Sequence, residues 1–156
     1  MKRFPTPIKY VVKNSEKYVG DLNSVISRSS WETKFMRWCD MNPSVELWGS
    51  EIQAIQYYSQ ADQKMRRYFP DFFIKVKMKD GSVKDFIIEI KPYDQTKPPV
   101  KGRKRQTTII TESMTWQVNQ DKWKAAKEWA RLHNFEFIIF TEFELGIRKR
   151  PKATNK

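Results

Sequence analysis

The sequence predicts a mixed α/β domain in which helices flank one main sheet. Three observations favour this class: an early helix with an apolar stripe, three strand-like segments separated by turn signals, and a second helix followed by a buried strand. With 156 residues and abundant aromatic side chains, the chain can bury a proper core. We expect an extended arm over residues 1–28, the domain itself over residues 29–147, and a basic, disordered tail over residues 148–156.

The first predicted element is a helix of about twelve residues. Ser29 or Ser30 caps its start, and it ends before Pro43. Cys39 is the only cysteine, so no disulfide can form within the chain, and we expect a thiol of the core. The buried stripe consists of residues at helical spacing, namely Trp31, Phe35, Trp38 and Cys39.

Three strands are predicted next. Alternating apolar and polar residues mark the first over Trp48–Tyr58, and a polar turn follows at Gln60–Gln63. The second covers Tyr68–Met78, and the pair Asp80-Gly81 is a strong signal for a hairpin turn into the third, Val83–Lys91. Together these segments predict a three-stranded meander.

The C-terminal half of the chain predicts a helical crossover. A proline-stiffened basic loop spans residues 97–105. A second helix is predicted from about Asn119 to His133, and the apolar run Phe135–Thr141 predicts a buried strand. Such a crossover makes the last strand a parallel neighbour of an earlier one.

Charge and composition narrow the function. The net charge of +12 and the pI near 9.8 favour a polyanionic partner such as DNA, although a merely soluble basic protein would show the same excess. His133 is the only histidine, which argues against a His-rich metal site. No apolar stretch approaches the roughly 20 residues of a membrane span, and the sequence shows no signal peptide and no Gly-rich phosphate loop. We therefore expect no membrane partner, no nucleotide cofactor, and a protein that is cytoplasmic or carried inside a particle.

Two short motifs carry the chemistry. Pro70-Asp71 opens the apolar run of one strand, and Glu89-Ile90-Lys91 closes the next strand. Strand alternation places Glu89 and Lys91 on one face, with Asp71 on the neighbouring strand within reach of both. The Asp71 and Glu89 carboxylates and the Ile90 backbone carbonyl would supply part of an oxygen shell for Mg²⁺, with Mn²⁺ as a substitute. Lys91 would orient the attacking water or offset charge during phosphodiester hydrolysis.

Each of these groups also has an ordinary structural explanation. Asp71 could be a turn residue beside a proline, and Glu89 with Lys91 could be a pair of solvated strand charges. Both motifs on adjoining strands of a strongly basic chain favour the catalytic interpretation. Glu32 is a third candidate acid, but Ser29 and Glu32 also have the spacing of a capping box, in which Glu32 bonds to the Ser29 amide. The spacing alone leaves both roles of Glu32 open.

Further polar residues are candidates for contacts with the DNA backbone. Asn119 could simply cap the second helix, although a helix start with Lys122 nearby is also a fair phosphate site. For each basic residue, a solvated surface charge is a serious alternative. The candidates are Arg66, Arg67, Lys97, Lys101, Arg103, Lys104, Arg105, Asn119 and Lys122.

Several segments resemble the head completion nucleases of T-even-type bacteriophages, in order over roughly residues 12–147. They include Arg28–Glu32, Trp48–Glu51, Arg66–Phe72, Glu89–Pro92, Val118–Ala126 and Phe137–Glu142. That family is similar to the PD-(D/E)xK superfamily and, within it, to the N-terminal domain of the transposon endonuclease TnsA. The resemblance implies a restriction-endonuclease-like fold and dependence on Mg²⁺. It also implies that Asp71 and Glu89 are metal ligands, that Lys91 is the catalytic lysine, and that Glu32 is the helix acid, which could complete the metal shell or help hold a second ion.

The resemblance further implies a nuclease that cuts packaged double-stranded DNA in the host cytoplasm, late in virion assembly, so that the filled head can be joined to a tail. Portal or neck proteins at the head–tail vertex would be its partners, and the nuclease would remain associated with the virion there. The main alternative is a structural joining protein that binds DNA or the portal without needing catalysis. A general DNA repair or restriction nuclease, with no capsid partner, is a third alternative.

Overall fold

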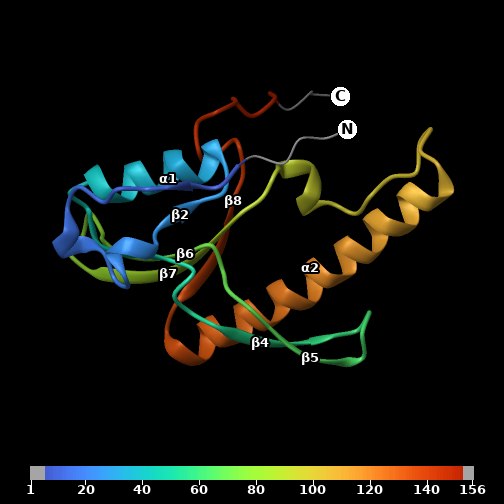
Figure 1. Ribbon diagram of the computed structural model, residues 1–156, viewed down its shortest axis with the longest axis horizontal. Coiled ribbons are helices and arrows are strands. Elements are labelled where there is room, and N and C mark those ends of the chain that lie inside the picture. Colours follow the sequence, from blue (N-terminus) through green and yellow to red (C-terminus); the bar gives the residue numbers. More distant parts are fainter. Residues whose placement is uncertain (1–5, 153–156) are drawn as a thin grey trace.

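The computed structural model describes residues 6–152 of the chain. A four-stranded mixed sheet lies between two α-helices, and two smaller two-stranded sheets accompany it (Figure 1). In chain order the elements are β1 (Ile8–Lys9), η1 (Ser15–Lys17), η2 (Leu22–Ser24), β2 (Ile26–Ser27), α1 (Ser30–Met41), β3 (Val45–Ser50), β4 (Ile55–Ser59), β5 (Lys64–Tyr68), β6 (Phe72–Lys77), β7 (Val83–Ile90), η3 (Tyr93–Thr96), α2 (Gln106–His133) and β8 (Glu136–Phe140).

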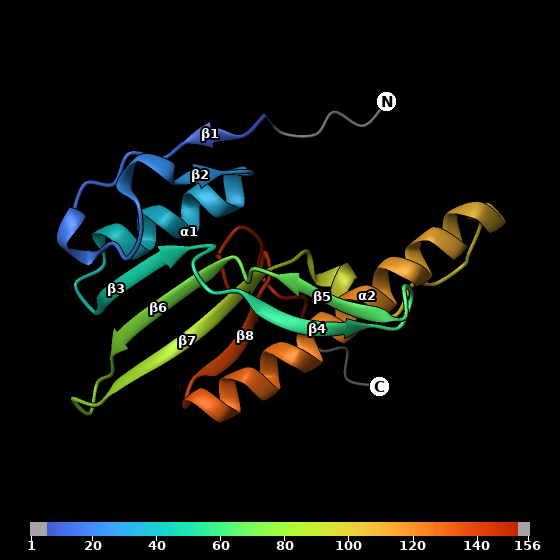
Figure 2. The same cartoon turned by 60° about the horizontal axis from the view of Figure 1, so that its bottom comes forward.

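The main sheet has the strand order β3-β6-β7-β8 (Figure 2). β6 pairs antiparallel with β3 and β7, whereas β8 pairs parallel with β7. The Asp80-Gly81 hairpin between β6 and β7 is confirmed, because Met78 N donates to Ser82 O at 2.7 Å and Gly81 has a φ of 88°. The parallel pairing of β8 through a helical crossover is also confirmed.

Two predicted strands are wrong in extent, because each combines segments of two different sheets. The predicted strand Trp48–Tyr58 is split into β3 and β4, and the predicted strand Tyr68–Met78 is split into β5 and β6. The breaks lie at Glu51, which has a φ of 51°, and at Pro70, which has no N–H for a sheet ladder. β4 and β5 pair with each other around the predicted turn at 60–63. They leave the main sheet as a hairpin that lies beside α2 and interrupts the predicted meander (Figure 2).

Helix α1 forms where predicted, and the Ser29 hydroxyl caps it by accepting a hydrogen bond from Glu32 N at 3.1 Å. Cys39 is fully buried as predicted, whereas Trp38, predicted in the same stripe, is 43% exposed. The buried face centres on Phe35, Met36 and Cys39, so Trp38 points about 100° away from it. This face packs on core residues of β3, β6 and β7, among them Trp48, Phe72 and Ile88.

The N-terminal segment is fastened to the C-terminal end of α1 through Asp40 and Lys17. The fully buried Asp40 carboxylate accepts hydrogen bonds from Lys13 N at 2.8 Å and Asn14 N at 2.9 Å. Lys17 Nζ donates to three carbonyl oxygens at the end of α1, at distances of 2.7, 3.0 and 2.8 Å. These carbonyls have no partner within the helix, so the lysine both pairs them and complements the helix dipole. The described part of the predicted arm therefore contains short ordered elements, and residues 1–5 lie outside the described residues.

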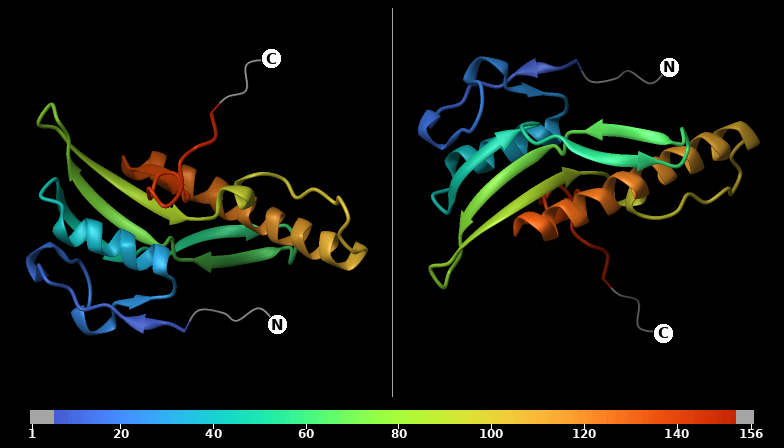
Figure 3. Two further views of the ribbon diagram at one scale, coloured as in Figure 1. Left: turned by 90° about the horizontal axis from the view of Figure 1, so that it is seen from above. Right: turned by 90° about the horizontal axis from the view of Figure 1, so that it is seen from below.

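Helix α2 begins at Gln106 and has 28 residues, so the predicted start at Asn119 is wrong. The additional first half is rich in β-branched residues and lacks a continuous apolar stripe, so its local sequence does not favour a helix. The middle of α2 packs against the β4–β5 hairpin, and the helix crosses the sheet face opposite to α1 (Figure 3). It ends at His133 as predicted, where Asn134 takes a left-handed conformation with a φ of 60°.

The end of the chain follows β8 without a further helix or strand through residue 152. Arg150 forms an ion pair with Glu144 at 2.7 Å, and residues 153–156 of the predicted tail lie outside the described residues. No helix within residues 6–152 is both long enough and apolar enough to cross a membrane.

Candidate active site

Asp71 and Glu89 lie side by side on the sheet face that α2 covers. Phe72 pairs with Ile88 in the β6–β7 register, which puts Asp71 opposite Glu89. Phe72 and Ile88 point into the core under α1, so their alternating neighbours point to the other face. Asp71 Oδ2 accepts a hydrogen bond from Ile90 N at 2.7 Å, which fixes this carboxylate against the end of β7. The structure thus brings the two predicted metal ligands together, and their role in catalysis stays a prediction.

Glu89 is buried and Asp71 is half-buried, and the charges of the two carboxylates repel each other. Glu89 is 7% exposed, and its Oε2 has no hydrogen-bond partner among the described residues. Burial, followed by the charge of Asp71, raises the pKa of Glu89 to about 8. Burial likewise raises the pKa of Asp71 to about 6, against the opposing effect of the hydrogen bond from Ile90 N. Two neighbouring carboxylates that repel each other, one of them with a buried oxygen that has no partner among the described residues, favour a bound cation.

The carboxylate oxygens of Asp71 and Glu89 suit an ion such as Mg²⁺, which needs few protein ligands. They do not form a closed site in which the protein supplies every ligand. Among residues 6–152, no three His, Cys, Asp or Glu side chains are grouped so that they could hold a metal ion. Mg²⁺ is commonly held by only one or two carboxylates, with waters and substrate phosphate oxygens in the other positions. Asp71 and Glu89 meet this requirement, and the contribution of the Ile90 carbonyl stays a prediction.

Two lysine side chains approach the carboxylate pair from different elements. Lys91 directly follows β7, and its charge lowers the pKa of both Asp71 and Glu89. Lys122 approaches from the middle of α2, with its Nζ 5.6 Å from the ring centre of Tyr68. Burial and the charge of Lys91 lower the pKa of Lys122, while Glu89 and Asp71 raise it. Both ammonium groups are therefore within electrostatic reach of the same pair of acids.

The predicted phosphate site at a helix N-terminus is wrong, because Asn119 and Lys122 lie well inside α2. Asn119 is not an N-cap, and the positive end of the helix dipole is far away at Gln106. Asn119 is instead a buried polar residue, 6% exposed. Lys122 lies near the acids through its place on the side of the helix.

Tyr68 is a residue of the site that the sequence pattern did not single out. Its hydroxyl is buried and has no hydrogen-bond partner among the described residues. Burial, then the charges of Glu89 and Asp71, raise its pKa. A phenol beside two carboxylates can donate to one of them or to a bound water. The alternation of apolar and polar residues along the strand does not indicate that Tyr68 belongs to the site, because a tyrosine at a strand end is normally a packing residue.

Glu32 lies at the edge of the site and is at the same time part of a helix cap. Its Oε2 accepts a hydrogen bond from Arg28 N at 2.5 Å. The donor is therefore the amide one residue before Ser29, which the capping box predicted as the donor. Arg28 also forms an ion pair with Glu51 at 3.1 Å. Burial raises the pKa of Glu32, and the Glu32 charge contributes to the raised pKa of Asp71. Glu51 has no predicted role, but it connects Arg28 with Asp71. Its carboxylate pairs with Arg28, and its backbone N–H donates to the Asp71 carbonyl at 3.0 Å.

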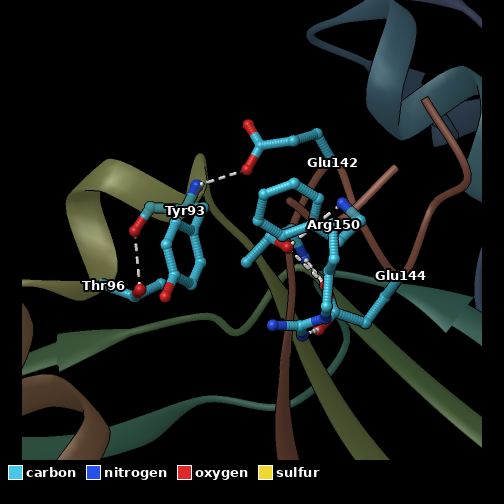
Figure 4. A network of polar contacts seen from close by, with 7 residues as sticks. Tyr93, Thr96, Glu142, Glu144 and Arg150 are labelled. Carbon is cyan, nitrogen blue, oxygen red and sulfur yellow. Dashed lines mark hydrogen bonds and ion pairs between the residues drawn. The ribbon is translucent and has the colours of Figure 1, made fainter. Parts of the chain in front are cut away.

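The segment that follows Lys91 is held by the last part of the chain (Figure 4). Lys91 N donates to Phe140 O at 3.0 Å, which extends the pairing of β7 with β8. Tyr93 N donates to Glu142 Oε1 at 2.8 Å, and the rings of Tyr93 and Phe143 pack with centres 5.0 Å apart. These contacts fix the backbone next to Lys91, which keeps its side chain in register with the acids.

The predicted DNA-contact residues of the β5 strand and of loop 97–105 lie outside this buried centre. Arg66 pairs with Asp62, and the Arg67 guanidinium lies 5.9 Å from the centre of the Phe69 ring. Loop 97–105 leads from η3 to the start of α2 (Figure 1). Its basic side chains are all exposed, namely Lys97, Lys101, Arg103, Lys104 and Arg105. Their contact with DNA stays a prediction.

The sequence is similar to those of known proteins. Residues 42–142 match the family described as TnsA-like endonuclease N terminal. The head completion nuclease of Enterobacteria phage T4 is 45% identical over an alignment of 138 residues that covers 86% of this chain and 89% of that protein. No solved structure matches the chain. The family match includes Asp71, Glu89, Lys91 and Lys122, whereas Glu32 lies before its first residue.

Proposed function

The chain belongs to the family of TnsA-like endonuclease N-terminal domains, and on this basis we propose that it is a metal-dependent DNA endonuclease of phage head completion. One observation carries the proposal. Half-buried Asp71 and buried Glu89 form a carboxylate pair in which Glu89 Oε2 has no partner among the described residues, and the charges of Lys91 and Lys122 act on this pair. A pair of acids with two nearby ammonium groups matches the needs of phosphodiester hydrolysis, which are positioning and stabilisation of charge.

Each side chain has a separate task in this proposal. Mg²⁺, or Mn²⁺ in its place, would polarise a phosphate oxygen and lower the pKa of a water at the site. Asp71, Glu89 and the Ile90 carbonyl would supply oxygen ligands to this ion. Lys91 orients the attacking water. Lys122 binds a phosphate oxygen and offsets the negative charge that develops on it.

Tyr68 and Glu32 support these groups. The Tyr68 hydroxyl donates to a carboxylate or to a water, which relieves the cost of a buried hydroxyl without a partner. Glu32 would supply a further carboxylate to the metal site, and the hydrogen bond that it accepts from Arg28 N holds this carboxylate at the edge of the site.

The substrate that we propose is packaged double-stranded DNA at the head–tail vertex. The net charge of +12 supports binding to the phosphate backbone, and phosphate contacts carry no sequence information, so we propose low sequence specificity. Assembly takes place in the host cytoplasm, and a portal or neck protein would deliver the DNA to the enzyme. The name of the T4 relative, a head completion nuclease, supports this setting.

Cleavage of plasmid DNA in Mg²⁺ tests the proposal. Asp71→Asn and Lys91→Ala should each lower the cleavage rate at least about 100-fold, because each removes a group that acts on the reacting phosphate. Glu46→Gln and Lys84→Ala are matched controls, since both side chains are exposed and lie on strands β3 and β7 of the same sheet. Full cleavage by Asp71→Asn would exclude the proposed site.

The same variants separate the endonuclease from a structural joining protein. In phage assembly, an inactive but folded Asp71→Asn protein should fail to support the formation of infectious particles. If it supports them at the wild-type level, head completion depends on binding alone, and the joining function is the correct one.

A further inference from the structure

A cavity that does not include the carboxylate pair lies between α2 and the segment that follows Lys91. It measures about 570 Å³ and is enclosed by η3, loop 97–105 and the first half of α2. Figure 1 shows the loop running along this half of the helix. The volume falls within the roughly 300–1,000 Å³ typical of sites for small molecules. The catalytic groups proposed above do not account for it, although Lys97 and Lys104 of its lining are among the predicted DNA-contact residues.

The lining of this cavity is neutral overall. Two lysines, Lys97 and Lys104, are balanced by Asp94 and Glu112, and Lys104 Nζ is already paired with Glu112 at 2.7 Å. The other lining residues are uncharged. A phosphate group would therefore gain little charge stabilisation here and would meet two carboxylates. An uncharged, flat ligand therefore fits this lining better than a phosphate group does.

Asn119 and Trp116 supply the means to recognise such a ligand. Asn119 is 6% exposed and lines the cavity. Its side-chain amide can donate and accept a hydrogen bond at the same time, so it can pair with a ligand that presents both kinds of group to the cavity wall. Trp116 offers an aromatic surface in the same cavity, and Pro98 and Pro99 form an apolar part of its wall. An aromatic ring plus a paired donor and acceptor is the combination that binds a nucleobase.

The cavity lies next to the carboxylate pair. Asn119 and Lys122 are three positions apart on α2, so their side chains project from the same side of the helix. On the other wall, η3 begins two residues after Lys91, and Lys97 Nζ lies 4.5 Å from the centre of the Tyr93 ring. A strand whose phosphate lies at Lys122 and Lys91 therefore passes the mouth of this cavity.

We propose that the cavity receives one unpaired nucleobase next to the phosphate that is cut, with the base stacked on Trp116 and hydrogen-bonded to Asn119. This inference rests on the proposed nuclease function and specifies its substrate. The enzyme then prefers DNA in which a base is already free of its partner, such as a bulge, a gap or a frayed end. A paired base must first be unstacked, which costs free energy that an unpaired base does not require.

Binding measured without cleavage tests this preference. Fluorescence anisotropy in EDTA compares a labelled duplex that contains one unpaired adenine with the same duplex fully paired. The wild-type protein should bind the bulged duplex about tenfold more tightly, in line with the strength of base stacking on aromatic side chains. Trp116→Ala and Asn119→Ala should lose this preference and keep the affinity for the paired duplex. Trp116→Phe should keep part of it, because the aromatic face remains.

Gln117→Ala is the matched control, an amide on the same helix that bonds to Asp121 and lies outside the cavity. Its preference for the bulge should equal that of the wild type. Equal affinity of the wild-type protein for both duplexes would overturn the inference, and so would an equal loss of affinity for both duplexes in Asn119→Ala. Because no cutting is measured, these results stand apart from the catalytic test. A bulge preference in a protein that cuts no DNA would support the cavity and reject the nuclease function.

Discussion

Glu89→Gln should make the metal-free protein more stable at alkaline pH and leave its stability nearly unchanged at about pH 5. Glu89 has a folded-state pKa of about 8 against an ordinary value of 4.5. A raised carboxyl pKa means that the folded protein binds the proton more tightly than the unfolded chain does. The resulting stabilisation is fully present below the ordinary pKa and is lost as the pH rises through the folded-state value.

The expected magnitude is large. A tenfold change in a dissociation constant corresponds to about 1.4 kcal/mol, so a rise from 4.5 to about 8 corresponds to a loss of roughly 5 kcal/mol once Glu89 is ionised. The total stability of a domain is only about 5–15 kcal/mol. Glutamine has nearly the same shape but carries no charge, so the variant should avoid most of this loss.

Urea unfolding in EDTA between about pH 5 and about pH 9 measures the effect. The free energy of unfolding of Glu89→Gln should exceed that of the wild type by several kcal/mol at the alkaline end. Glu136→Gln, at a side chain 56% exposed, is the control for the general change in net charge. Mn²⁺ added at about pH 8 should stabilise the wild type and not Glu89→Gln, because the ion binds the folded carboxylate pair. Parallel curves for wild type and Glu89→Gln across the whole pH range would refute the reasoning.

Three further substitutions probe other parts of the structure. Gly49→Ala should lower the free energy of unfolding by about 1–3 kcal/mol, because the new Cβ would lie 2.8 Å from Val19 O; an unchanged urea midpoint would contradict this. Lys17→Met should cost about 1–3 kcal/mol by leaving three carbonyls at the end of α1 without their donor, and faster proteolysis within residues 6–28 should accompany it. Lys122→Met should slow plasmid cleavage about 100-fold without weakening Mn²⁺ binding, and weaker Mn²⁺ binding would point to a structural role instead.

The features of the fold that the sequence predicts well are those set by local signals. Ser29 fixes the start of α1, and Asp80-Gly81 fixes the β6–β7 turn. That turn also sets the strand register and therefore places Asp71 opposite Glu89. Adjacency of the two acids could be predicted because it depends on one hairpin and on the alternation of side chains, both of which are short-range.

The features that could not be predicted depend on contacts between distant segments. The alternating pattern continues through Glu51 and Pro70, so it does not reveal that the chain changes sheets there. The first half of α2 has weak helix propensity and depends on tertiary contacts. For this reason the sequence pattern puts Lys122 at a helix start rather than beside Glu89. The role of Tyr68 has no signal in the sequence, because it arises from the packing of the β4–β5 hairpin against α2.

The parallel pairing of β7 and β8 has a consequence for the newly made polypeptide. β7, which carries Glu89, lies between β6, which precedes it in synthesis, and β8, which follows only after the 28 residues of α2. A ribosome must therefore translate past Phe140 before β7 gains its second neighbour. Incomplete translation products that stop before α2 lack Lys122 and leave β7 as an open sheet edge. The order of synthesis thus delays the assembly of Glu89, Lys91 and Lys122 into one centre until the polypeptide is almost finished.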